Sequence, residues 1–228
     1  VNIMKLTKLP QHIGFILDGN GRWAMRFHQS RNYGHLQGVK TLKEIIKLVK
    51  DTGIPYMSVY AFSVENMNRP QEEVDFLLDL AQNEFNQIKE QLLTEDKLNY
   101  NLRIIGEDEK LPAELLAIKR YINEKEMIEG AFTLFIAFNY SSKLEILQAS
   151  KDATDLKMLE QKLYTCPAPP LDLVIRTSGE QRLSNFMLYQ ASYAELYFDK
   201  CFWPAYNKRH LFKALKWYQS RKRNFGKI

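Results

Sequence analysis

The stretch His12-Ile-Gly-Phe-Ile-Leu-Asp-Gly-Asn-Gly-Arg-Trp-Ala24 predicts a buried strand, a glycine turn and the start of a helix. The apolar run Ile13–Leu17 forms the strand, and Asp18 follows at its end. In the turn Gly19-Asn20-Gly21, backbone N–H groups can approach a ligand, and the helix that Arg22 enters adds its dipole. Such a turn favours an anion, whereas a carboxylate repels a bare phosphate. We therefore expect a divalent cation between the two, that is, a metal–diphosphate site, although the pattern also fits a purely structural turn.

The length and composition predict one large α/β domain over residues 1–228. With 45% hydrophobic residues the chain can bury a sizeable core, and it has no run of about 18 apolar residues that would span a membrane. The first residues lack the apolar core of a signal peptide, and Cys166 and Cys201 have no metal-ligand spacing, so we expect a cytoplasmic protein. The net charge of +5 suits nucleic acid, anionic lipid or diphosphates, and charge alone does not choose among them.

Strand and helix patterns alternate along the whole chain. Six short apolar runs predict strands: Ile13–Leu17, Tyr56–Phe62, Leu102–Ile105, Phe132–Phe138, Leu171–Ile175 and Leu196–Phe202. Helical spacing predicts a face with Val39, Leu42, Ile46 and Val49, a long amphipathic helix from Val74 to Leu92, and a last helix capped by Asn207. The alternation predicts a single-domain α/β fold with a mainly parallel six-stranded sheet flanked by helices.

In open parallel sheets, ligands bind at the carboxyl ends of the strands. This rule places Asp18 on one rim with three segments that follow predicted strands, namely 61–70, 139–143 and 176–184. Each segment alone is a weak indication, because polar residues in loops are usually only solvated. Their convergence on one rim is the argument for a functional site there.

A first group of candidate anion ligands lies near the amino end of the chain and after the second strand. Arg31 and His35 lie four residues apart and can clamp an anion together, although His35 fits a structural cap equally well. The segment Ala61–Pro70 adds a hydroxyl, a carboxylate, an amide and a guanidinium, supplied by Ser63, Glu65, Asn66 and Arg69. We expect these side chains to form one diphosphate site.

A second group lies in the segment Ile175–Asn185. Arg176 and Arg182 can pair bidentately with phosphate oxygens, and Ser184 adds a donor, so this segment predicts a second, separate diphosphate site. Further along, Glu195 lies in an aromatic, apolar run and needs a partner, either a cation or a salt bridge.

Several reaction classes lack their signatures. No DDxxD motif occurs, and Asp75-Phe-Leu-Leu-Asp79 has the wrong spacing, which disfavours an all-helical trans-type prenyl synthase. The glycine turn is neither a dinucleotide fingerprint nor a Walker loop. No Ser–His–Asp order and no cysteine–histidine metal set stands out.

Four ordered motifs resemble those of the cis-prenyltransferases, in particular the bacterial undecaprenyl diphosphate synthases. They are His12–Ala24, Gly34-His35 with Arg31 before it, Ala61–Pro70, and Asp172–Leu196 with its Arg-Thr-Ser-Gly-Glu and Arg-Leu-Ser-Asn-Phe sequences. The resemblance runs from about His12 to Gly226. One such motif could arise by chance, whereas four in order hardly could.

The resemblance implies a homodimeric, Mg²⁺-dependent enzyme whose fold encloses a hydrophobic tunnel. Its substrates would be farnesyl diphosphate and isopentenyl diphosphate, condensed repeatedly with cis double bonds. The implied product is undecaprenyl diphosphate, which serves cell-wall lipid carrier synthesis. A membrane-soluble product favours peripheral contact with the inner face of the membrane, and no nucleic acid is expected as a partner.

The same resemblance implies roles for individual residues. Asp18 would hold Mg²⁺ at the catalytic centre with Glu195 as a further metal ligand, and Asn66, helped by Ser63, would assist removal of the proton by positioning. The allylic substrate would bind to Gly19, Asn20, Gly21, Arg22, Trp23, Arg31, His35, Ser63, Val64, Glu65, Met67 and Arg69, with Trp23 on its first isoprene units. Isopentenyl diphosphate would bind to Arg176, Arg182, Leu183 and Ser184.

Some positions depart from the family pattern. Asn139-Tyr-Ser-Ser-Lys143 stands where Asn-Tyr-Gly-Gly-Arg is common, and Met67 replaces a common tryptophan. Phe138 is bulky where alanine is frequent, which would narrow the tunnel. Asn224 occupies the arginine position of the C-terminal arginine-any-glycine motif, which supports the partner subunit's isopentenyl site, and Arg223 lies one residue earlier.

Two other classes of function remain as alternatives. A non-catalytic regulatory subunit of the same fold should have lost the aspartate or the arginines, and this chain retains them. A nucleic-acid-binding protein is disfavoured because the basic residues show no stripe with interleaved aromatics in the sequence.

Overall fold

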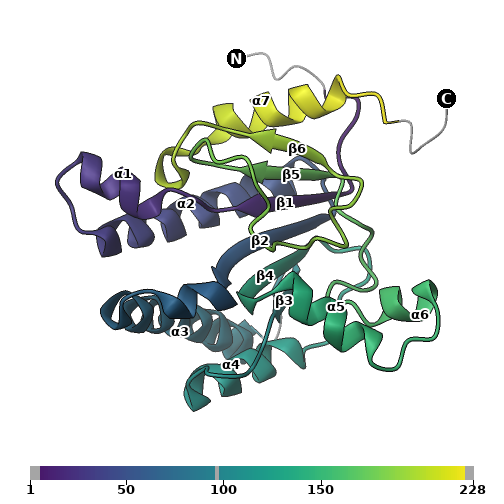
Figure 1. Ribbon diagram of the computed structural model, residues 1–228, viewed down its shortest axis with the longest axis horizontal. Coiled ribbons are helices and arrows are strands. Elements are labelled where there is room, and N and C mark those ends of the chain that lie inside the picture. Colours follow the sequence, from purple (N-terminus) through teal and green to yellow (C-terminus); the bar gives the residue numbers. More distant parts are fainter. Residues whose placement is uncertain (1–5, 96–97, 224–228) are drawn as a thin grey trace.

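A six-stranded sheet forms the centre of the fold in a computed structural model that describes residues 6–95 and 98–223 (Figure 1). Its strands are β1 (His12–Ile16), β2 (Tyr56–Ser63), β3 (Asn101–Ile105), β4 (Thr133–Tyr140), β5 (Leu173–Arg176) and β6 (Glu195–Phe198). They lie in the order β3-β4-β2-β1-β5-β6, and each neighbouring pair is parallel. The predicted α/β class with a six-stranded, mainly parallel sheet is confirmed.

Helices flank this sheet on both faces (Figure 1). They are α1 (Asn20–Arg26), α2 (Arg31–Asp51), α3 (Gln71–Glu95), α4 (Ala113–Asn123), α5 (Ser142–Ser150), α6 (Leu156–Gln161) and α7 (Lys208–Gln219), with 3₁₀ helices η1 (Val64–Asn68) and η2 (Trp203–Ala205). Alternate strand residues enter two cores, as the period of two requires. Phe15 and Ile136 lie in the core shared with α2, α3, α4 and α7, whereas Ala137 and Val174 face the opposite cluster around Phe186.

The observed strands match the predicted ones within one or two residues, except at the end of the sixth. The predicted strand Leu196–Phe202 ends at Phe198 because the chain turns there. The Asp199 carboxylate accepts a hydrogen bond from the Cys201 N–H at 2.9 Å. The backbone beyond Phe198 binds the loop after β5 instead, where the N–H of Gly179 donates to the carbonyl of Asp199 at 2.8 Å.

The apolar face predicted for α2 is only partly right. The buried side of this helix consists of Gly34, Gly38, Thr41, Ile45 and Val49. Of the predicted face only Val49 belongs to it, whereas Val39, Leu42 and Ile46 lie on the neighbouring side and line a cavity. Both sets repeat every three or four residues, so helical spacing alone does not separate packed core from cavity wall.

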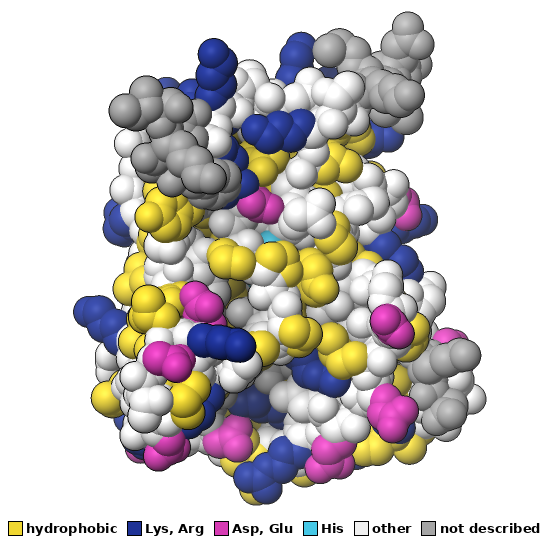
Figure 2. Space-filling model, turned by 90° about the vertical axis from the view of Figure 1, so that its right-hand side faces the viewer, with side chains coloured by type: hydrophobic (Ala, Val, Ile, Leu, Met, Phe, Trp, Pro, Cys, Tyr) yellow, Lys and Arg dark blue, Asp and Glu magenta, His cyan; other side chains and the backbone are white. Residues whose placement is uncertain are grey.

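The carboxyl ends of the strands lie on the same side of the molecule as α1 (Figure 1). Figure 2 views the opposite end, which holds the amino ends of the strands. There, apolar side chains gather in the middle of the face, and acidic and basic side chains mix toward its lower end. No helix within the described residues is long and apolar enough to cross a membrane. Asn224 and Gly226 of the C-terminal motif lie outside the described residues.

Candidate active site

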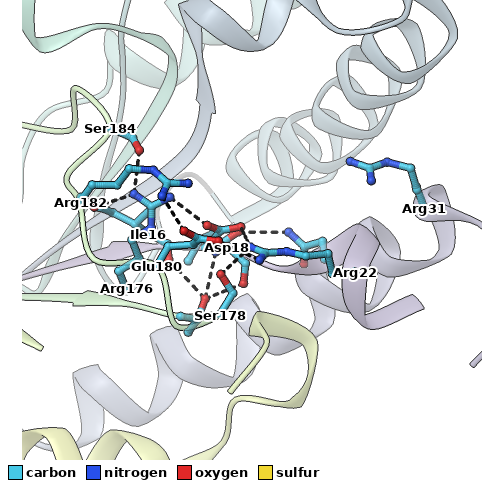
Figure 3. Close-up of polar contacts among 12 residues, drawn as sticks. Ile16, Asp18, Arg22, Arg31, Arg176, Ser178, Glu180, Arg182 and Ser184 are labelled. Atoms are coloured by element: carbon cyan, nitrogen blue, oxygen red, sulfur yellow. Dashed lines mark hydrogen bonds and ion pairs between the residues drawn. The ribbon is translucent and has the colours of Figure 1, made fainter. Parts of the chain in front are cut away.

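Asp18 lies directly after β1 and is held by two arginines (Figure 3). One carboxylate oxygen accepts from the Arg22 guanidinium at 3.0 Å and the other from Arg176 at 2.9 Å. The Asp18 N–H donates to the Thr177 hydroxyl at 2.9 Å, which fixes the backbone. Burial would raise the pKa of Asp18, but the hydrogen bonds and charges of Arg176 and Arg22 outweigh it and hold the pKa below its usual value. Asp18 is therefore an ionised ligand.

Arg176 organises the segment that follows β5. Its side chain is buried, and one terminal nitrogen donates to the carbonyl of Arg182 at 2.5 Å and to the Ser184 hydroxyl at 2.7 Å. The Arg182 side chain itself is exposed and pairs with Glu180 at 2.5 Å. The predicted group Arg176, Arg182 and Ser184 therefore does come together, on one side of Asp18 (Figure 3).

Glu180 links this group to the glycine turn. Its carboxylate also accepts from Arg22 at 2.9 Å, and Arg22 donates to the Ser178 hydroxyl at 2.7 Å. Arg22 thus lies between Asp18 and the segment after β5 in an ion-pair network of both signs. In this structure Arg22 is engaged by Asp18, Ser178 and Glu180, whereas the resemblance assigned it to the allylic group.

A second cationic cluster forms around Glu73, in the first turn of α3. Its carboxylate lies 2.9 Å from Arg69, 3.2 Å from Arg31 and 3.5 Å from the Nε2 atom of His35. Arg31, His35 and Arg69, three of the residues predicted to bind the allylic diphosphate, are thus gathered by one carboxylate. Figure 3 shows Arg31 set apart from the Asp18 network. The two cationic groups are separate, and the binding of a diphosphate by each stays a prediction.

His35 is uncharged at neutral pH in this cluster. Burial, and then the charge of Arg69, lower its pKa to about 4 although Glu73 acts in the opposite direction. Its Nε2 atom and the Oδ1 atom of Asn20 are both buried without a hydrogen-bond partner. Buried polar atoms of this kind need a partner, so the pair indicates a place for a polar ligand.

The segment after β2 forms the 3₁₀ helix η1 and closes on itself. The Ser63 N–H donates to the Oδ1 atom of Asn66 at 3.0 Å, as one half of a capping box. Glu65 accepts from the Asn185 amide at 2.9 Å, which ties η1 to the segment after β5. Val64 is half-buried, and Met67 packs against the main core. The Asn66 side chain thus has a structural task, and its catalytic role stays a prediction.

A largely apolar cavity of about 630 Å³ begins beside these clusters. At one end it is lined by Leu17, Asn20 and His35, and it continues between α2, α3 and the sheet. Its apolar wall includes Val39, Leu42, Ile46, Phe62, Leu77, Phe85, Ile88 and Phe138. The centroid of the Phe138 ring lies 5.2 Å from that of Phe62 and 5.7 Å from that of Phe85, so these three rings pack together in the cavity wall. A polar head held at His35 would place an apolar tail in this cavity.

Trp23 and Leu183 both pack against apolar side chains, and their contacts with substrate stay predictions. Trp23 does not line the cavity; its ring packs 5.1 Å from Phe27 and 6.1 Å from Tyr33 between centroids. Leu183 packs against the core cluster on the other face of the sheet rather than presenting a polar ligand. Both follow from local apolar contacts that the motif pattern does not show.

Glu195 does not join Asp18 in a common metal site within one chain. It pairs across the sheet with Leu173, which pairs with Ile13 at the amino end of β1. The chain from Ile13 to Asp18 spans about 16 Å at about 3.3 Å per residue, so one ion cannot bridge both carboxylates. Instead Glu195 pairs with Arg221 at 3.2 Å, the salt bridge that the sequence left open.

Asp18 nevertheless fits a magnesium ion bound together with a substrate. No group of three or more His, Cys, Asp or Glu side chains suited to a metal occurs among residues 6–95 and 98–223. Mg²⁺ commonly uses only one or two carboxylates and takes its other ligands from substrate phosphates and water. Asp18 is one ionised carboxylate, and the arginines nearby would hold the diphosphate that supplies the other ligands.

Sequence reasoning missed the acidic partners of the arginines. Glu73 lies four residues after Arg69, a spacing that predicts a helical ion pair, and Glu180 lies within the quoted segment Ile175–Asn185. Asn185 was missed too, although it follows Ser184 directly. It binds Glu65 and the Ser141 hydroxyl, at 2.9 and 2.8 Å. Acidic side chains are not anion ligands, so a pattern of cations and donors does not point to the acids that hold them in place.

Comparisons with known proteins point to one family. Residues 16–226 match the family model described as "Putative undecaprenyl diphosphate synthase". Isoprenyl transferases of Thermotoga maritima and Staphylococcus saprophyticus are 41% and 38% identical, over 96% and 98% of this chain and 97% and 92% of theirs.

Two solved structures share the fold. Lavandulyl diphosphate synthase from Lavandula x intermedia, in complex with dimethylallyl diphosphate, is 30% identical with a TM-score of 0.84, over 96% of this chain and 99% of that one. A probable undecaprenyl diphosphate synthase from Campylobacter jejuni is 28% identical with a TM-score of 0.75, over 97% and 100%. The chain therefore belongs to the undecaprenyl diphosphate synthase family and is a prenyltransferase.

Proposed function

We propose that this prenyltransferase condenses isopentenyl diphosphate repeatedly onto farnesyl diphosphate with cis double bonds. The product would be undecaprenyl diphosphate, the precursor of a cell-wall lipid carrier. One observation carries the proposal: two separate cationic groups flank Asp18, and one of them stands at the end of an apolar cavity. That arrangement suits two diphosphates of which one bears a long apolar tail.

The cluster around Glu73 would bind the allylic substrate. Arg31 and Arg69 would transfer their hydrogen bonds from the Glu73 carboxylate to diphosphate oxygens, and His35 would add a ring nitrogen. The farnesyl tail would lie in the cavity, which we propose to be the hydrophobic tunnel of the family. The cavity wall supports this orientation, because its apolar residues begin next to His35.

The segment after β5 would bind isopentenyl diphosphate. Arg182 and Ser184 are exposed, and Arg176 is buried beneath them. Arg176 joins Ser184 to Asp18, so a diphosphate seated there would lie beside the carboxylate at the catalytic centre. This geometry would bring the isopentenyl double bond toward the allylic carbon.

The reaction breaks the allylic C–O bond as negative charge builds on the departing diphosphate. Asp18 would help to hold Mg²⁺, which would neutralise the charge on the departing diphosphate. Arg31 and Arg69 would stabilise the same charge more strongly in the transition state than in the ground state. The isopentenyl double bond then forms the new C–C bond with the allylic carbon, and a proton leaves the neighbouring isopentenyl carbon to a weak base. Asn66 would position that step, since an amide is a poor base.

We extend the proposal to a homodimer at the cytoplasmic face of the membrane. β6 is an edge strand, and Leu196 on it is 37% exposed, beside Tyr193 at 68%. Exposed apolar side chains beside an open strand edge suit an interface between two copies. Because the product partitions into lipid, we expect the enzyme to act beside the membrane.

The test is incorporation of radiolabelled isopentenyl diphosphate with farnesyl diphosphate and Mg²⁺. We expect Asp18→Ala to lose at least about a hundredfold in rate, because it removes the ionised ligand at the catalytic centre. Asp152→Ala, a change of the same type at an exposed position near α6, should match wild type. Chromatography of the product reads its length. The proposal fails if wild type forms no prenyl product or if Asp18→Ala is as active as wild type.

A further inference from the structure

The junction of α1 and α2 exposes a contiguous group of large apolar side chains. Phe27 is 58% exposed, Leu36 42% and Tyr33 38%. Trp23 joins the group, since its ring lies 5.1 Å from Phe27 and stacks on Tyr33 with an interplanar angle of 15°. Leu36 lies three residues after Tyr33 on α2 and therefore beside it. Exposed apolar groups of this kind mark interaction sites more often than single exposed residues do.

The segment that carries this group has several basic residues and no acidic ones. Residues 19–43 contain the five basic residues Arg22, Arg26, Arg31, Lys40 and Lys43, and no Asp or Glu. Along α2, Tyr33, Leu36, Lys40, Lys43 and Lys47 repeat every three or four residues, so they share one outer side of the helix. All five are exposed. The sequence did not indicate this stripe, because buried and cavity-lining residues are interleaved with it.

Only one of the three lysines on this side is engaged by the protein. Lys43 pairs with Glu84 at 2.6 Å. Lys40 and Lys47 make no ion pair with any residue that the structure describes. Two unengaged ammonium groups lie beside the apolar tip, which is formed by Phe27, Tyr33 and Leu36. Together they are complementary to a surface that is both anionic and apolar, such as a phospholipid bilayer with acidic head groups.

The same side of α2 borders the mouth of the cavity. Lys43, Lys47 and Lys50 line it from α2, and Glu84, Gln87 and Gln91 line it from α3. The wall is thus apolar inside and polar along the gap between the two helices. An apolar tail that outgrows the cavity would leave through this gap, beside the exposed lysines.

We propose that this face, made of Phe27, Tyr33, Leu36, Lys40 and Lys47, docks the protein on an anionic phospholipid bilayer. The apolar tip enters the interface while the lysines contact lipid phosphates. Docked in this way, the gap between α2 and α3 faces the lipid, so a growing tail passes directly into the bilayer. The path of the tail rests on the proposed function, whereas docking itself does not.

Co-sedimentation with lipid vesicles tests the docking without substrate. Vesicles hold phosphatidylcholine and phosphatidylglycerol in equal parts, or phosphatidylcholine alone. We expect wild type to sediment with the mixed vesicles, to bind the neutral ones weakly, and to be released at high salt. The triple variant Phe27→Ser, Leu36→Ser, Lys40→Glu should lose about tenfold or more in affinity for the mixed vesicles, because it removes apolar area and reverses a charge.

A matched control makes the same changes at the other end of the molecule. The variant Leu147→Ser, Leu156→Ser, Lys157→Glu replaces residues that are exposed on α5 and α6, away from α1 (Figure 1). It should bind vesicles as wild type does. Circular dichroism and prenyl transfer with detergent-dispersed substrate should be unchanged in both variants, since none of the six positions lines the cavity or the site.

Three results would overturn the proposal. The first is that wild type does not bind mixed vesicles, and the second is that both triple variants bind them equally. The third is that the α1–α2 variant loses affinity for a single-stranded oligonucleotide but keeps its affinity for vesicles, which would assign the face to nucleic acid. Wild type that binds vesicles but transfers no prenyl group would refute the proposed function and leave docking supported.

Discussion

Alanine at Gly34 should destabilise the protein, whereas alanine at Gly38, one turn further along the same side of α2, should not. A Cβ atom at Gly34 would lie 2.1 Å from the backbone oxygen of Asn20 and 3.1 Å from the Cβ atom of Ala24. At Gly38 it would lie 2.3 Å from the side-chain Oδ1 atom of Asn20 and 3.2 Å from the Trp203 ring. The first overlap is with backbone and the second with the end of a side chain.

The change in unfolding free energy depends on whether the group that overlaps the new Cβ atom can move. Each substitution gains about 1 kcal/mol in helix propensity. At Gly34 the overlap is relieved only if α1 shifts away from α2, and overpacking of this kind costs about 1–3 kcal/mol or more, so we expect a net loss of about 1–2 kcal/mol. At Gly38 the Asn20 side chain can rotate. Its bond to the carbonyl of Leu17 at 3.2 Å is then lost, which costs about 1 kcal/mol and cancels the gain.

For Gly38→Ala we expect activity to fall without a loss of stability, whereas Gly34→Ala should lower both. Both displace the Asn20 amide, which borders the cavity next to His35. Gly38→Ala is therefore expected to fold as well as wild type yet lose at least about tenfold in kcat/KM for the allylic diphosphate, an effect of about 1.4 kcal/mol. Urea unfolding followed by circular dichroism measures the first quantity and initial rates the second. Equal unfolding free energies for the two variants would refute the distinction between backbone and side-chain overlap.

Two further predictions concern the core. His12 is fully buried between the Pro169 carbonyl and the Ser58 hydroxyl, each 2.7 Å away, and burial lowers its pKa from 6.5 to about 4. Because the unfolded chain takes up the proton first, the free energy of unfolding should fall by up to ~3 kcal/mol as the pH drops from 6.5 to 4. Urea titrations should show a shallower fall for His12→Gln, in which the fall that remains is due to His35. An equal pH dependence of the unfolding free energy in wild type and variant would contradict this. Phe138→Ala should cost about 3 kcal/mol in stability and lengthen the product, because it removes a cavity-wall ring that stacks on Phe62 and meets Phe85 edge to face. Product chromatography measures the length, and an unchanged distribution would show that Phe138 does not limit it.

The rim of the site could be predicted because it depends on strand direction and order alone. Once alternating patterns imply parallel strands, every residue that follows a strand lies at one edge of the sheet. Asp18 and Glu65 follow β1 and β2, Arg176 is the last residue of β5, and each is within one hydrogen bond of another segment on that rim. The glycine turn and the two cationic groups therefore came from sequence with their positions nearly right.

The same rule shows why Glu195 lies apart from Asp18 within one chain. The family resemblance gives it a role without saying at which end of a strand it lies. Glu195 begins β6, and Asp18 follows the end of β1, so parallel order sets them at opposite edges. Strand direction alone therefore predicts this separation from the sequence.

The side of α2 that faces the cavity could not be predicted in this way. Its core side contains Gly34, Gly38 and Thr41, which carry little apolar signal, whereas Val39, Leu42 and Ile46 carry a strong one and line open space. Hydrophobic periodicity reports apolar surroundings and does not say whether protein or ligand supplies them. Small residues mark the close packing here, and large ones mark the space for a tail.

The acidic residues change how substrate affinity should be understood. Arg31 and Arg69 are paired with Glu73, and Arg22 and Arg182 with Glu180, before any diphosphate arrives. Under the proposed function a diphosphate therefore exchanges partners with a carboxylate instead of meeting free cations. Its affinity is the difference between two sets of ion pairs, so a ligand with more charge and more oxygens than a carboxylate is favoured. Discrimination between diphosphates and weaker anions is then set by Glu73 and Glu180 as much as by the arginines that bind the substrate.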